Sequence, residues 1–335
     1  MERALRVATE VRPAGIIATG SYTPPRVLTN FDLEKMVETS DEWIGTRTGI
    51  VERRIAESDV ATSDLAHLAA QAALDSAGLM ADELDLIMVA TVTPDMFFPC
   101  TAAVVQGKLG PTMAAFDILV GCTGFVYGLA VAREMVASGA YNRILVCGAD
   151  TLSRIVDWED RSTCVLFGDA AGAVIVAPVE EGRGILGYSL GNDATNAECL
   201  KIPAGGSRMP ASQETVSGRM HYLQMNGPEV FKFAVRVMAE SSEQVVQRAG
   251  LQMGDITLVI PHQANMRIID AAAKRFNLPG ERFARNVERY GNTSAATIPL
   301  ALDEAVRAGK VNSGDHILLC SFGAGLNWAS MVMRW

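Results

Sequence analysis

The stretch "GCTGFVYGLAVAREMVASGAYNRILVCG" at residues 121–148 decides the fold, because the chain contains a second version of it. The second version is "GNTSAATIPLALDEAVRAGKVNSGDHILLCS" at residues 291–321. In both, a glycine, a polar residue and a threonine come before an amphipathic helix pattern, and an apolar strand pattern follows. Thr123 corresponds to Thr293, 170 positions later. A repeat at this spacing indicates two similar halves of about 170 residues each.

A second pair of similar segments supports the duplication. Residues 76–90 ("SAGLMADELDLIMVA") resemble residues 248–262 ("RAGLQMGDITLVIPH"), at an offset of 172. We therefore predict an N-terminal half over residues 1–180 and a C-terminal half over residues 181–335.

Short apolar runs bounded by turn residues predict buried strands at residues 84–91, 115–121, 142–150, 256–263 and 315–323. Strands that alternate with helix patterns indicate an α/β fold with covered sheets. Residues 185–226 have weak periodicity, and we predict a loop-rich excursion that walls a substrate channel.

Composition excludes several function classes. The chain has 335 residues and a net charge of −9, which argues against non-specific binding to nucleic acid or to anionic membranes. No run reaches the roughly 18 apolar residues of a membrane span. The N-terminal "MERALRVATEVRPAG" lacks the apolar core of a signal peptide. The six cysteines form no disulfide framework, and no residue cluster has metal-ligand spacing. These features predict a cytoplasmic protein without a metal.

Three residues are candidates for catalysis. Cys122 stands at the predicted corner between a strand and a helix, where the helix N-terminus would favour the thiolate and lower the pKa from about 8.5. His262 ends an apolar strand, and Asn292 occupies the corner that corresponds to Cys122. Ligands of open α/β sheets collect at the carboxyl ends of strands, so we expect these three residues to meet. Each also has an ordinary interpretation: a buried cysteine, a structural histidine, and an asparagine that caps a turn.

Five motifs resemble one known family. They are "TSDEWIGTRTGI" (39–50), "GCTGF" (121–125), "PHQANMRII" (261–269), "YGNTSAAT" (290–297) and "SFGAGLNW" (321–328). With them, nearly the whole chain resembles the β-ketoacyl-acyl-carrier-protein synthase III family. The resemblance implies the thiolase fold, with two pseudo-symmetric βαβαβαββ halves in α-β-α-β-α layers. It also implies a cytoplasmic homodimeric acyltransferase of fatty acid biosynthesis.

The resemblance further implies a reaction in two stages. Cys122 takes the acyl group from a starter acyl-CoA, which is a substrate and not a cofactor. Malonyl-acyl-carrier protein then loses CO2, and its carbanion attacks the acyl-enzyme to give 3-oxoacyl-acyl-carrier protein. By resemblance, a neutral His262 and Asn292 donate hydrogen bonds to the enolate oxygen, and the backbone N–H groups of Cys122 and Ala324 form the oxyanion hole. Ala324 stands where the family often has glycine, and alanine tolerates positive φ poorly.

Binding residues are also implied by the resemblance. The expected CoA contacts are Trp43, Arg47, Arg161 and Asn265. The expected contacts with the acidic carrier protein are Lys232, Arg267, Lys274 and Arg275. Each of these side chains is also typical of an ordinary solvated surface. Phe98 matches the residue that reaches across the dimer and closes the partner's acyl pocket.

Two alternative functions stay open at this point, and a third is disfavoured. A related ketosynthase or acyltransferase of secondary metabolism would share these motifs. A thiolase needs a second cysteine, but Cys320 stands one residue early, which turns its side chain to the other face of a strand. A hydrolase would use Cys122 and His262 to cleave thioesters. The preferred starter acyl group is not specified by the sequence.

Overall fold

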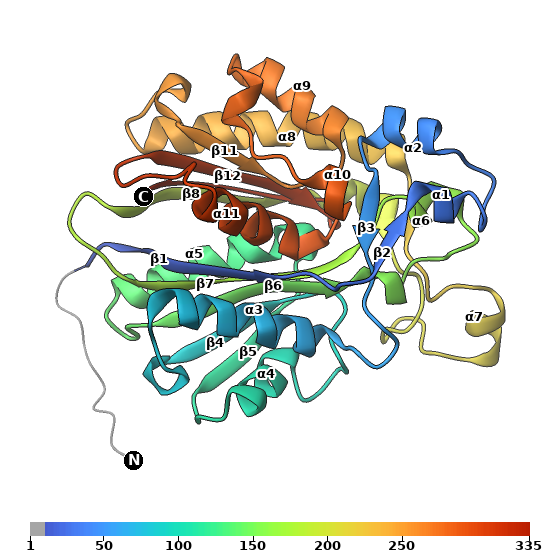
Figure 1. Ribbon diagram of the computed structural model, residues 1–335, viewed down its shortest axis with the longest axis horizontal. Helices are drawn as coiled ribbons and strands as arrows, with labels where there is room; N and C mark the ends of the chain where they lie inside the picture. Colours follow the sequence, from blue (N-terminus) through green and yellow to red (C-terminus); the bar gives the residue numbers. More distant parts are fainter. Residues whose placement is uncertain (1–10) are drawn as a thin grey trace.

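The computed structural model describes residues 11–335 (Figure 1). The first ten residues, which belong to the segment without a signal-peptide pattern and to the predicted N-terminal half, lie outside the described residues.

The first sheet has five strands, all from residues 14–178. In spatial order they are β1 (Ala14–Tyr22), β7 (Asp169–Pro178), β6 (Ile144–Thr151), β4 (Leu86–Ala90) and β5 (Ala114–Ile118). The strands predicted at residues 84–91, 115–121 and 142–150 are confirmed. β4 runs parallel to both β5 and β6, and β4 and β6 are buried along their whole length, as expected for parallel strands covered on both faces. β5 is only partly buried because it forms an edge of the sheet, so the prediction of a buried strand was wrong there.

The second sheet has four strands, all from residues 184–334. In spatial order they are β11 (Leu258–Pro261), β12 (His316–Gly323), β13 (Asn327–Arg334) and β8 (Gly184–Asn192). The strands predicted at residues 256–263 and 315–323 are confirmed. The prediction of a loop-rich excursion over residues 185–226 was wrong for its first part, because β8 pairs with β13 in antiparallel register. Glycine and serine positions weaken its alternation, so the strand depends on its partner more than on its own pattern.

Helices and sheets form five layers, which Figure 1 shows from bottom to top. The helices that pack on the sheets are α3 (Thr62–Ala77), α4 (Thr101–Leu109), α5 (Gly124–Ala137), α8 (Gly227–Arg248), α9 (Met266–Phe276) and α11 (Thr297–Arg307). α3 and α4 cover the outer face of the first sheet, α5 and α11 lie between the sheets, and α8 covers the outer face of the second. Close packing needs small residues: a Cβ added to Gly172 of β7 would lie 2.7 Å from the backbone nitrogen of Leu300 in α11. The expected α-β-α-β-α arrangement is present.

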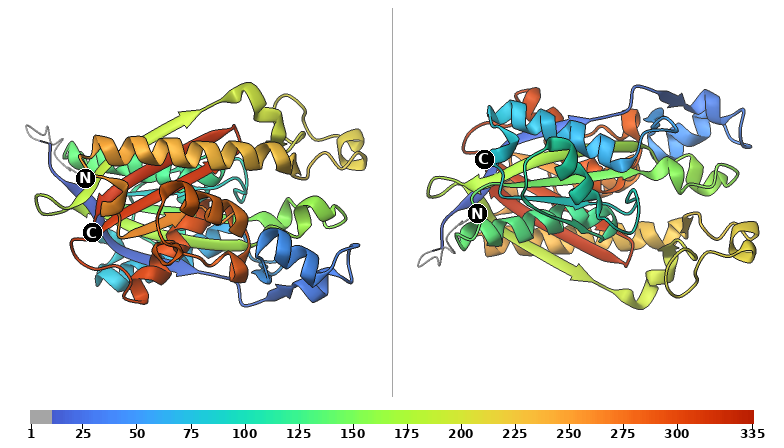
Figure 2. Two further views of the ribbon diagram at one scale, coloured as in Figure 1. Left: turned by 90° about the horizontal axis from the view of Figure 1, so that it is seen from above. Right: turned by 90° about the horizontal axis from the view of Figure 1, so that it is seen from below.

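Shorter elements extend from one end of the layered body, as both views in Figure 2 show. They are β2 (Val27–Thr29), α1 (Asn30–Leu33), α2 (Asp41–Thr48), β3 (Glu52–Arg54), α6 (Arg161–Cys164), β9 (Leu200–Lys201), α7 (Gln213–Ser217), β10 (Gln224–Met225) and α10 (Val287–Tyr290). β3 packs against α10, so segments from both ends of the chain meet here. The two sheets fall on either side of residue 180, and the division into halves at that residue remains our interpretation. Within residues 11–335, no helix combines the length and apolar character needed to cross a bilayer.

Candidate active site

Both sheets contribute to one cavity of about 950 Å³. Cys122, His262 and Asn292 all line it, together with Gly323 and Ala324. The first of these follows β5 in the first sheet, whereas the others come from the second half of the chain. Residues that are far apart in the sequence therefore meet on one surface, as the duplication led us to expect.

The Cys122 corner is built from glycine and a single turn of 3-10 helix. β5 ends at Ile118, Gly121 has φ of +59°, and the turn at Gly121–Thr123 leads directly into α5. Positive φ is readily available only to glycine, so Gly121 makes the sharp turn possible. The hydroxyl of Thr123 donates to the carbonyl of Val120 at 2.8 Å and fixes the turn. The predicted corner between a strand and a helix is present.

The acidity of Cys122 differs from the expectation. Burial raises the pKa of the thiol to about 12, and the negative charge of Asp150 acts in the same direction. The expected lowering by the helix N-terminus was wrong, because removing the thiolate from water costs more than the helix end offers. The resting side chain is therefore a thiol, and a nucleophilic role requires a neighbouring base.

His262 lies at the end of β11 and is 1% exposed. Its backbone N–H donates to the carbonyl of Cys320 at 2.8 Å, and its ring meets the Phe322 ring edge-on at 5.1 Å between centroids. Burial lowers the pKa of the imidazole to about 3, so the ring is neutral at physiological pH. The expectation of a neutral histidine agrees with this environment.

Thr297 orients the imidazole. Its Oγ1 lies 2.7 Å from His262 Nδ1, and the same hydroxyl is placed to donate to the carbonyl of Ser294 at 3.0 Å. A hydroxyl has one proton and can also accept. When Thr297 donates to Ser294, Nδ1 carries the imidazole proton and Nε2 is an acceptor. When Thr297 donates to Nδ1, Nε2 carries the proton and is a donor.

Asn292 is held on both sides of its backbone. Its N–H donates to the carbonyl of Leu166 at 2.8 Å, and its carbonyl accepts from the N–H of Gly168 at 3.1 Å. Its side-chain Oδ1 accepts from the N–H of Ser294 at 2.9 Å. Since the oxygen is occupied, the NH2 group is the part of the amide that is available to a ligand in the cavity.

Two backbone segments approach each other beside Cys122. A Cβ added to Gly323 would lie 2.9 Å from the backbone nitrogen of Cys122, and one added to Gly121 would lie 3.5 Å from that of Ala324. The hairpin between β12 and β13 therefore reaches the Cys122 turn because Gly323 has no side chain. Ala324 is not among the described non-glycine residues with positive φ, so its side chain is compatible with this loop.

The residues expected to bind CoA line the cavity with one exception. The guanidinium of Arg161 lies 4.9 Å from the ring centroid of Trp43, an arrangement typical of a cation–π pair. Trp43, Arg47 and Asn265 line the cavity, whereas Arg161 lies outside its lining. Asn265 already has structural partners: its amide donates to the carbonyl of Arg47 at 3.2 Å, and its Oδ1 caps α9.

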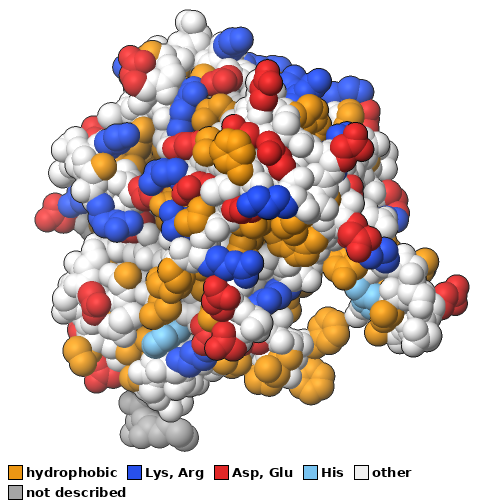
Figure 3. All heavy atoms as spheres, turned by 45° about the vertical axis from the view of Figure 1, so that its right-hand side comes forward, with side chains coloured by type: hydrophobic (Ala, Val, Ile, Leu, Met, Phe, Trp, Pro, Cys, Tyr) orange, Lys and Arg blue, Asp and Glu red, His pale blue; other side chains and the backbone are white. Residues whose placement is uncertain are grey.

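The residues expected to bind the carrier protein divide into two pairs. Lys232 and Arg267 line the cavity, and Lys232 is paired with Glu229 at 2.7 Å. Lys274 and Arg275 lie in the last turn of α9, where positive charge also favours the helix dipole. Figure 3 shows Lys and Arg side chains gathered along the upper edge of the molecule, the level at which Figure 1 places α9.

Phe98 lies on a separate apolar surface. It is 85% exposed, and its neighbours Met96 and Phe97 are also exposed. Leu119, on the segment that follows the edge strand β5, is exposed as well. Leu119 also lines the active-site cavity, whereas the three exposed side chains at residues 96–98 share one loop, which is typical of an interface.

Sequence reasoning missed Asp150 and Thr297. Asp150 is completely buried behind Cys122, and its Oδ1 accepts from the hydroxyl of Thr91 at 2.9 Å and the N–H of Val92 at 2.8 Å. An acidic residue at the carboxyl end of a predicted buried strand was the available signal for Asp150. Thr297 had no comparable signal, because its role depends on a histidine 35 positions away.

Comparisons with known proteins agree with this architecture. Residues 116–194 match the model described as 3-oxoacyl-[acyl-carrier-protein] synthase III, and residues 246–335 match its C-terminal model. The chain is 59% identical to beta-ketoacyl-[acyl-carrier-protein] synthase III of Caldanaerobacter subterraneus subsp. tengcongensis, over 96% of this chain and 98% of that one.

Solved structures show the same similarity. The chain is 50% identical to the Thermus thermophilus synthase III, with a TM-score of 0.90, covering 96% of this chain and 99% of that one. It is 35% identical to the priming beta-ketosynthase of the R1128 polyketide pathway, with a TM-score of 0.91, covering 99% and 98% of the two chains.

Proposed function

The chain belongs to the beta-ketoacyl-[acyl-carrier-protein] synthase III family, and we propose that Cys122, His262 and Asn292 are its catalytic residues. It is an acyltransferase that initiates fatty acid synthesis by condensing a starter acyl-CoA with malonyl-acyl-carrier protein. One observation carries the proposed residue roles: a thiol, a neutral imidazole and a free amide NH2 line the same cavity.

In the first half-reaction, Cys122 attacks the thioester carbon of acyl-CoA. Nε2 of His262 accepts a hydrogen bond from the thiol while Thr297 donates to Ser294, and the thiol proton ends on the departing CoA sulfur without a charged imidazolium. The backbone N–H groups of Cys122 and Ala324 stabilise the oxyanion of the tetrahedral intermediate. A sulfur nucleophile suits this step because it is also a good leaving group from the acyl-enzyme.

In the second half-reaction, the malonyl thioester loses CO2 and negative charge develops on its carbonyl oxygen. Before this step His262 exchanges its Nδ1 proton with solvent and takes one up on Nε2, as Thr297 turns to donate to Nδ1. The NH2 group of Asn292 and the Nε2–H of His262 then donate to that oxygen. The carbanion attacks the acyl carbon on Cys122, the sulfur leaves as a thiolate, and a proton from solvent restores the thiol. The products are CO2 and 3-oxoacyl-acyl-carrier protein.

Substrate contacts follow from the placement of the remaining residues. CoA would lie against Trp43, Arg47, Arg161 and Asn265. Lys232, Arg267, Lys274 and Arg275 would receive the acidic carrier protein. Within residues 11–335, Arg267, Lys274 and Arg275 form no ion pair, so their charges are available to such a partner.

A homodimer is the proposed assembly. Hydrophobic side chains project from the lower edge of the molecule in Figure 3, and Met96, Phe97 and Phe98 are the exposed aromatic and sulfur-containing side chains of one loop. β5 is the edge strand of the first sheet, and on its outer side it has no partner strand among residues 11–335. An unpaired edge beside an apolar loop favours a second copy as the occupant, with Phe98 reaching into its acyl pocket.

The alternative functions have less support. Cys320 is buried in the core and does not line the cavity, which argues against a thiolase. A role in secondary metabolism has one specific observation in its favour, the similarity to the priming ketosynthase of a polyketide pathway. The starter acyl group that Cys122 accepts distinguishes these settings.

The experiment offers the protein a panel of acyl-CoAs and measures the intact mass before and after malonyl-acyl-carrier protein is added. We expect a mass gain of one acyl group on wild type, its loss when the malonyl donor arrives, and no gain on Cys122→Ala. Acylation that persists in Cys122→Ala would show that another residue is the nucleophile. Rapid release of free acid without the malonyl donor would favour the hydrolase.

A further inference from the structure

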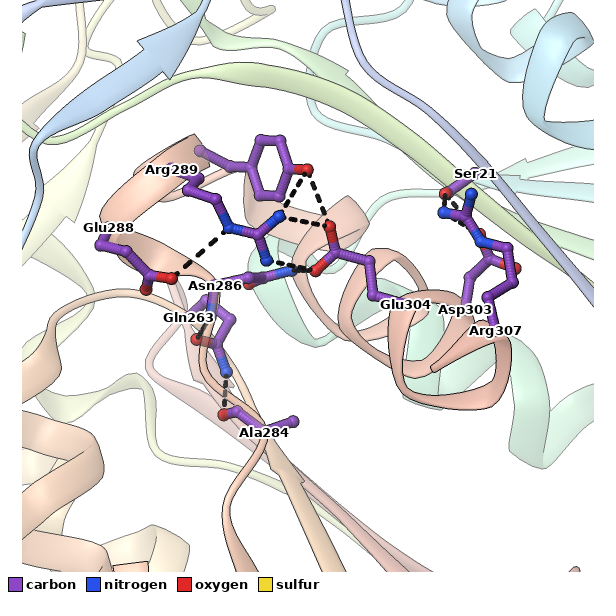
Figure 4. Close-up of polar contacts among 10 residues, drawn as sticks. Ser21, Gln263, Ala284, Asn286, Glu288, Arg289, Asp303, Glu304 and Arg307 are labelled. Atoms are coloured by element: carbon purple, nitrogen blue, oxygen red, sulfur yellow. Dashed lines mark hydrogen bonds and ion pairs between the residues drawn. The ribbon is translucent and has the colours of Figure 1, made fainter. Parts of the chain in front are cut away.

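Two adjacent carboxylates on α11 serve different parts of the molecule (Figure 4). Asp303 is buried and accepts from the hydroxyls of Thr19 and Ser21 on β1, and it pairs with Arg307 at 2.8 Å. It therefore fastens α11 to the first sheet. Glu304 points the other way, toward the segments that precede Asn292 and follow His262.

The first arm from Glu304 leads to His262. Glu304 Oε2 accepts from the side-chain amide of Asn286 at 3.0 Å. The backbone N–H of Asn286 donates to Oε1 of Gln263 at 3.1 Å, and Gln263 is the residue directly after His262. Gln263 is completely buried, and its Nε2 donates to the carbonyls of Pro261 and Ala284. The side-chain amide of Gln263 thus ties the residue after His262 to the residue before it and to Ala284.

The second arm leads to Asn292. The hydroxyl of Tyr290 donates to Glu304 Oε1 at 2.7 Å, and Tyr290 stands two residues before Asn292. Arg289 donates to both carboxylate oxygens, at 3.1 and 2.9 Å. Because the Arg289 guanidinium pairs with this carboxylate, these bonds are charge-assisted and hold α10 against α11.

We propose that Glu304 is a positioning residue that fixes the spacing between His262 and Asn292, and so serves the decarboxylation of the malonyl donor. The inference rests on the proposed function, which assigns both residues to that step. Decarboxylation requires two donors to meet one oxygen, so it depends on their mutual distance. Acylation of Cys122 does not use Asn292 and depends on that distance less.

Removing the Glu304 charge breaks both arms. Glu304→Gln keeps the size of the side chain but has one acceptor oxygen in place of two. The oxygen cannot satisfy Asn286 and Tyr290 together, and the new NH2 group faces donors. Since Asn286 is buried, an unsatisfied amide there favours a shift of its segment rather than a local gap.

The experiment measures the two half-reactions separately in single turnovers. Acyl-enzyme is formed from acyl-CoA and quantified by intact mass, and malonyl-acyl-carrier protein is then added. In Glu304→Gln we expect condensation to slow by about 10- to 100-fold, as a misplacement of about 1 Å can do, while acylation stays within about threefold. Tyr290→Phe removes one hydroxyl and should also slow condensation selectively, by a smaller factor than Glu304→Gln.

Asp303→Asn is the matched control, because it alters the neighbouring carboxylate on the same helix. We expect it to lower the melting temperature without changing the ratio of the two rates. The proposal is overturned if Glu304→Gln and Tyr290→Phe slow both half-reactions equally, or leave condensation unchanged. The proposed function fails separately, when wild type itself forms no acyl-enzyme on Cys122.

Discussion

The corners that carry Cys122 and Asn292 have similar backbone turns, but they differ in how many hydrogen bonds hold the polar residue. Each corner has a glycine with positive φ, +59° at Gly121 and +63° at Gly291, followed by a polar residue, a short 3-10 turn and a helix. At Asn292, two hydrogen bonds with the segment 166–168 hold the backbone, and the N–H of Ser294 holds the side-chain oxygen. At Cys122, the turn is closed by Thr123 and the side chain faces the cavity.

The difference corresponds to the proposed roles. A nucleophile accepts acyl groups, which requires open space next to the sulfur. The barrier to its acylation is lowered by backbone N–H groups and by an acceptor for the thiol proton. An amide that stabilises an enolate must already be in position when charge develops, because its contribution depends on preorganisation. The duplicated fold thus supplies one open corner and one fixed corner to a single reaction.

His262 belongs to neither corner and should serve both half-reactions. We expect His262→Ala to slow acylation and condensation each by roughly 10²- to 10⁴-fold, because the hydrogen-bond acceptor for the thiol and one enolate donor are lost together. Single-turnover intact-mass measurements with acyl-CoA and malonyl-acyl-carrier protein test this. A loss confined to condensation would show that another group accepts the proton of Cys122.

The open corner should show a weakly acidic thiol. With a raised pKa of about 12, the thiolate fraction of Cys122 grows tenfold with each pH unit. Alkylation by iodoacetamide, followed on the Cys122 peptide, should accelerate by about 100-fold between pH 7 and pH 9 without a plateau. A plateau below pH 8 would mean that the helix N-terminus outweighs burial.

Thr297 links the His262 ring to the fixed corner, because its hydroxyl contacts both Nδ1 and the Ser294 carbonyl. Thr297→Val keeps the shape and removes the hydroxyl, so we expect both half-reactions to slow by about tenfold. Thr297→Ser should restore most of the rate. Equal losses in the two variants would indicate a packing effect of the methyl group.

Burial of His262 predicts a small pH dependence of stability. Its pKa is lowered to about 3 in the folded state, whereas the unfolded value is about 6.5, so the unfolded chain binds more protons between these limits. Its stabilising contribution is therefore complete above pH 6.5 and is lost as the pH falls toward 3. Urea unfolding should show that wild type loses up to about 2 kcal/mol more than His262→Gln between pH 6.5 and 5. Parallel pH profiles would contradict this.

Much of this arrangement was predictable because the two halves repeat local patterns. The central strands, the corner at Cys122 and the meeting of three polar side chains follow from apolar runs and from the repeat. The acidity of Cys122 was predicted with the wrong sign, because the depth of burial depends on segments that the local pattern does not include. β8 was missed because its pairing with β13 stabilises a weakly alternating strand.

Other features depend on contacts across the chain. Asp150 accepts hydrogen bonds from residues 91–93 and from the N–H of Ala295 at 3.2 Å, and its charge acts on the Cys122 thiol. Glu304 reaches the neighbours of both His262 and Asn292 because α11 packs against β11 and bonds to residues 286 and 290. Such roles arise from tertiary packing, so residue type and spacing alone do not identify them.

The most direct test of the two-corner account is a single-turnover comparison of wild type and Asn292→Ala, with acylation and condensation measured in the same samples. The account predicts that acylation of Cys122 stays within about threefold of wild type, while condensation falls by roughly 10²- to 10³-fold through loss of one preorganised donor. Equal slowing of both steps, or unchanged condensation, would contradict it.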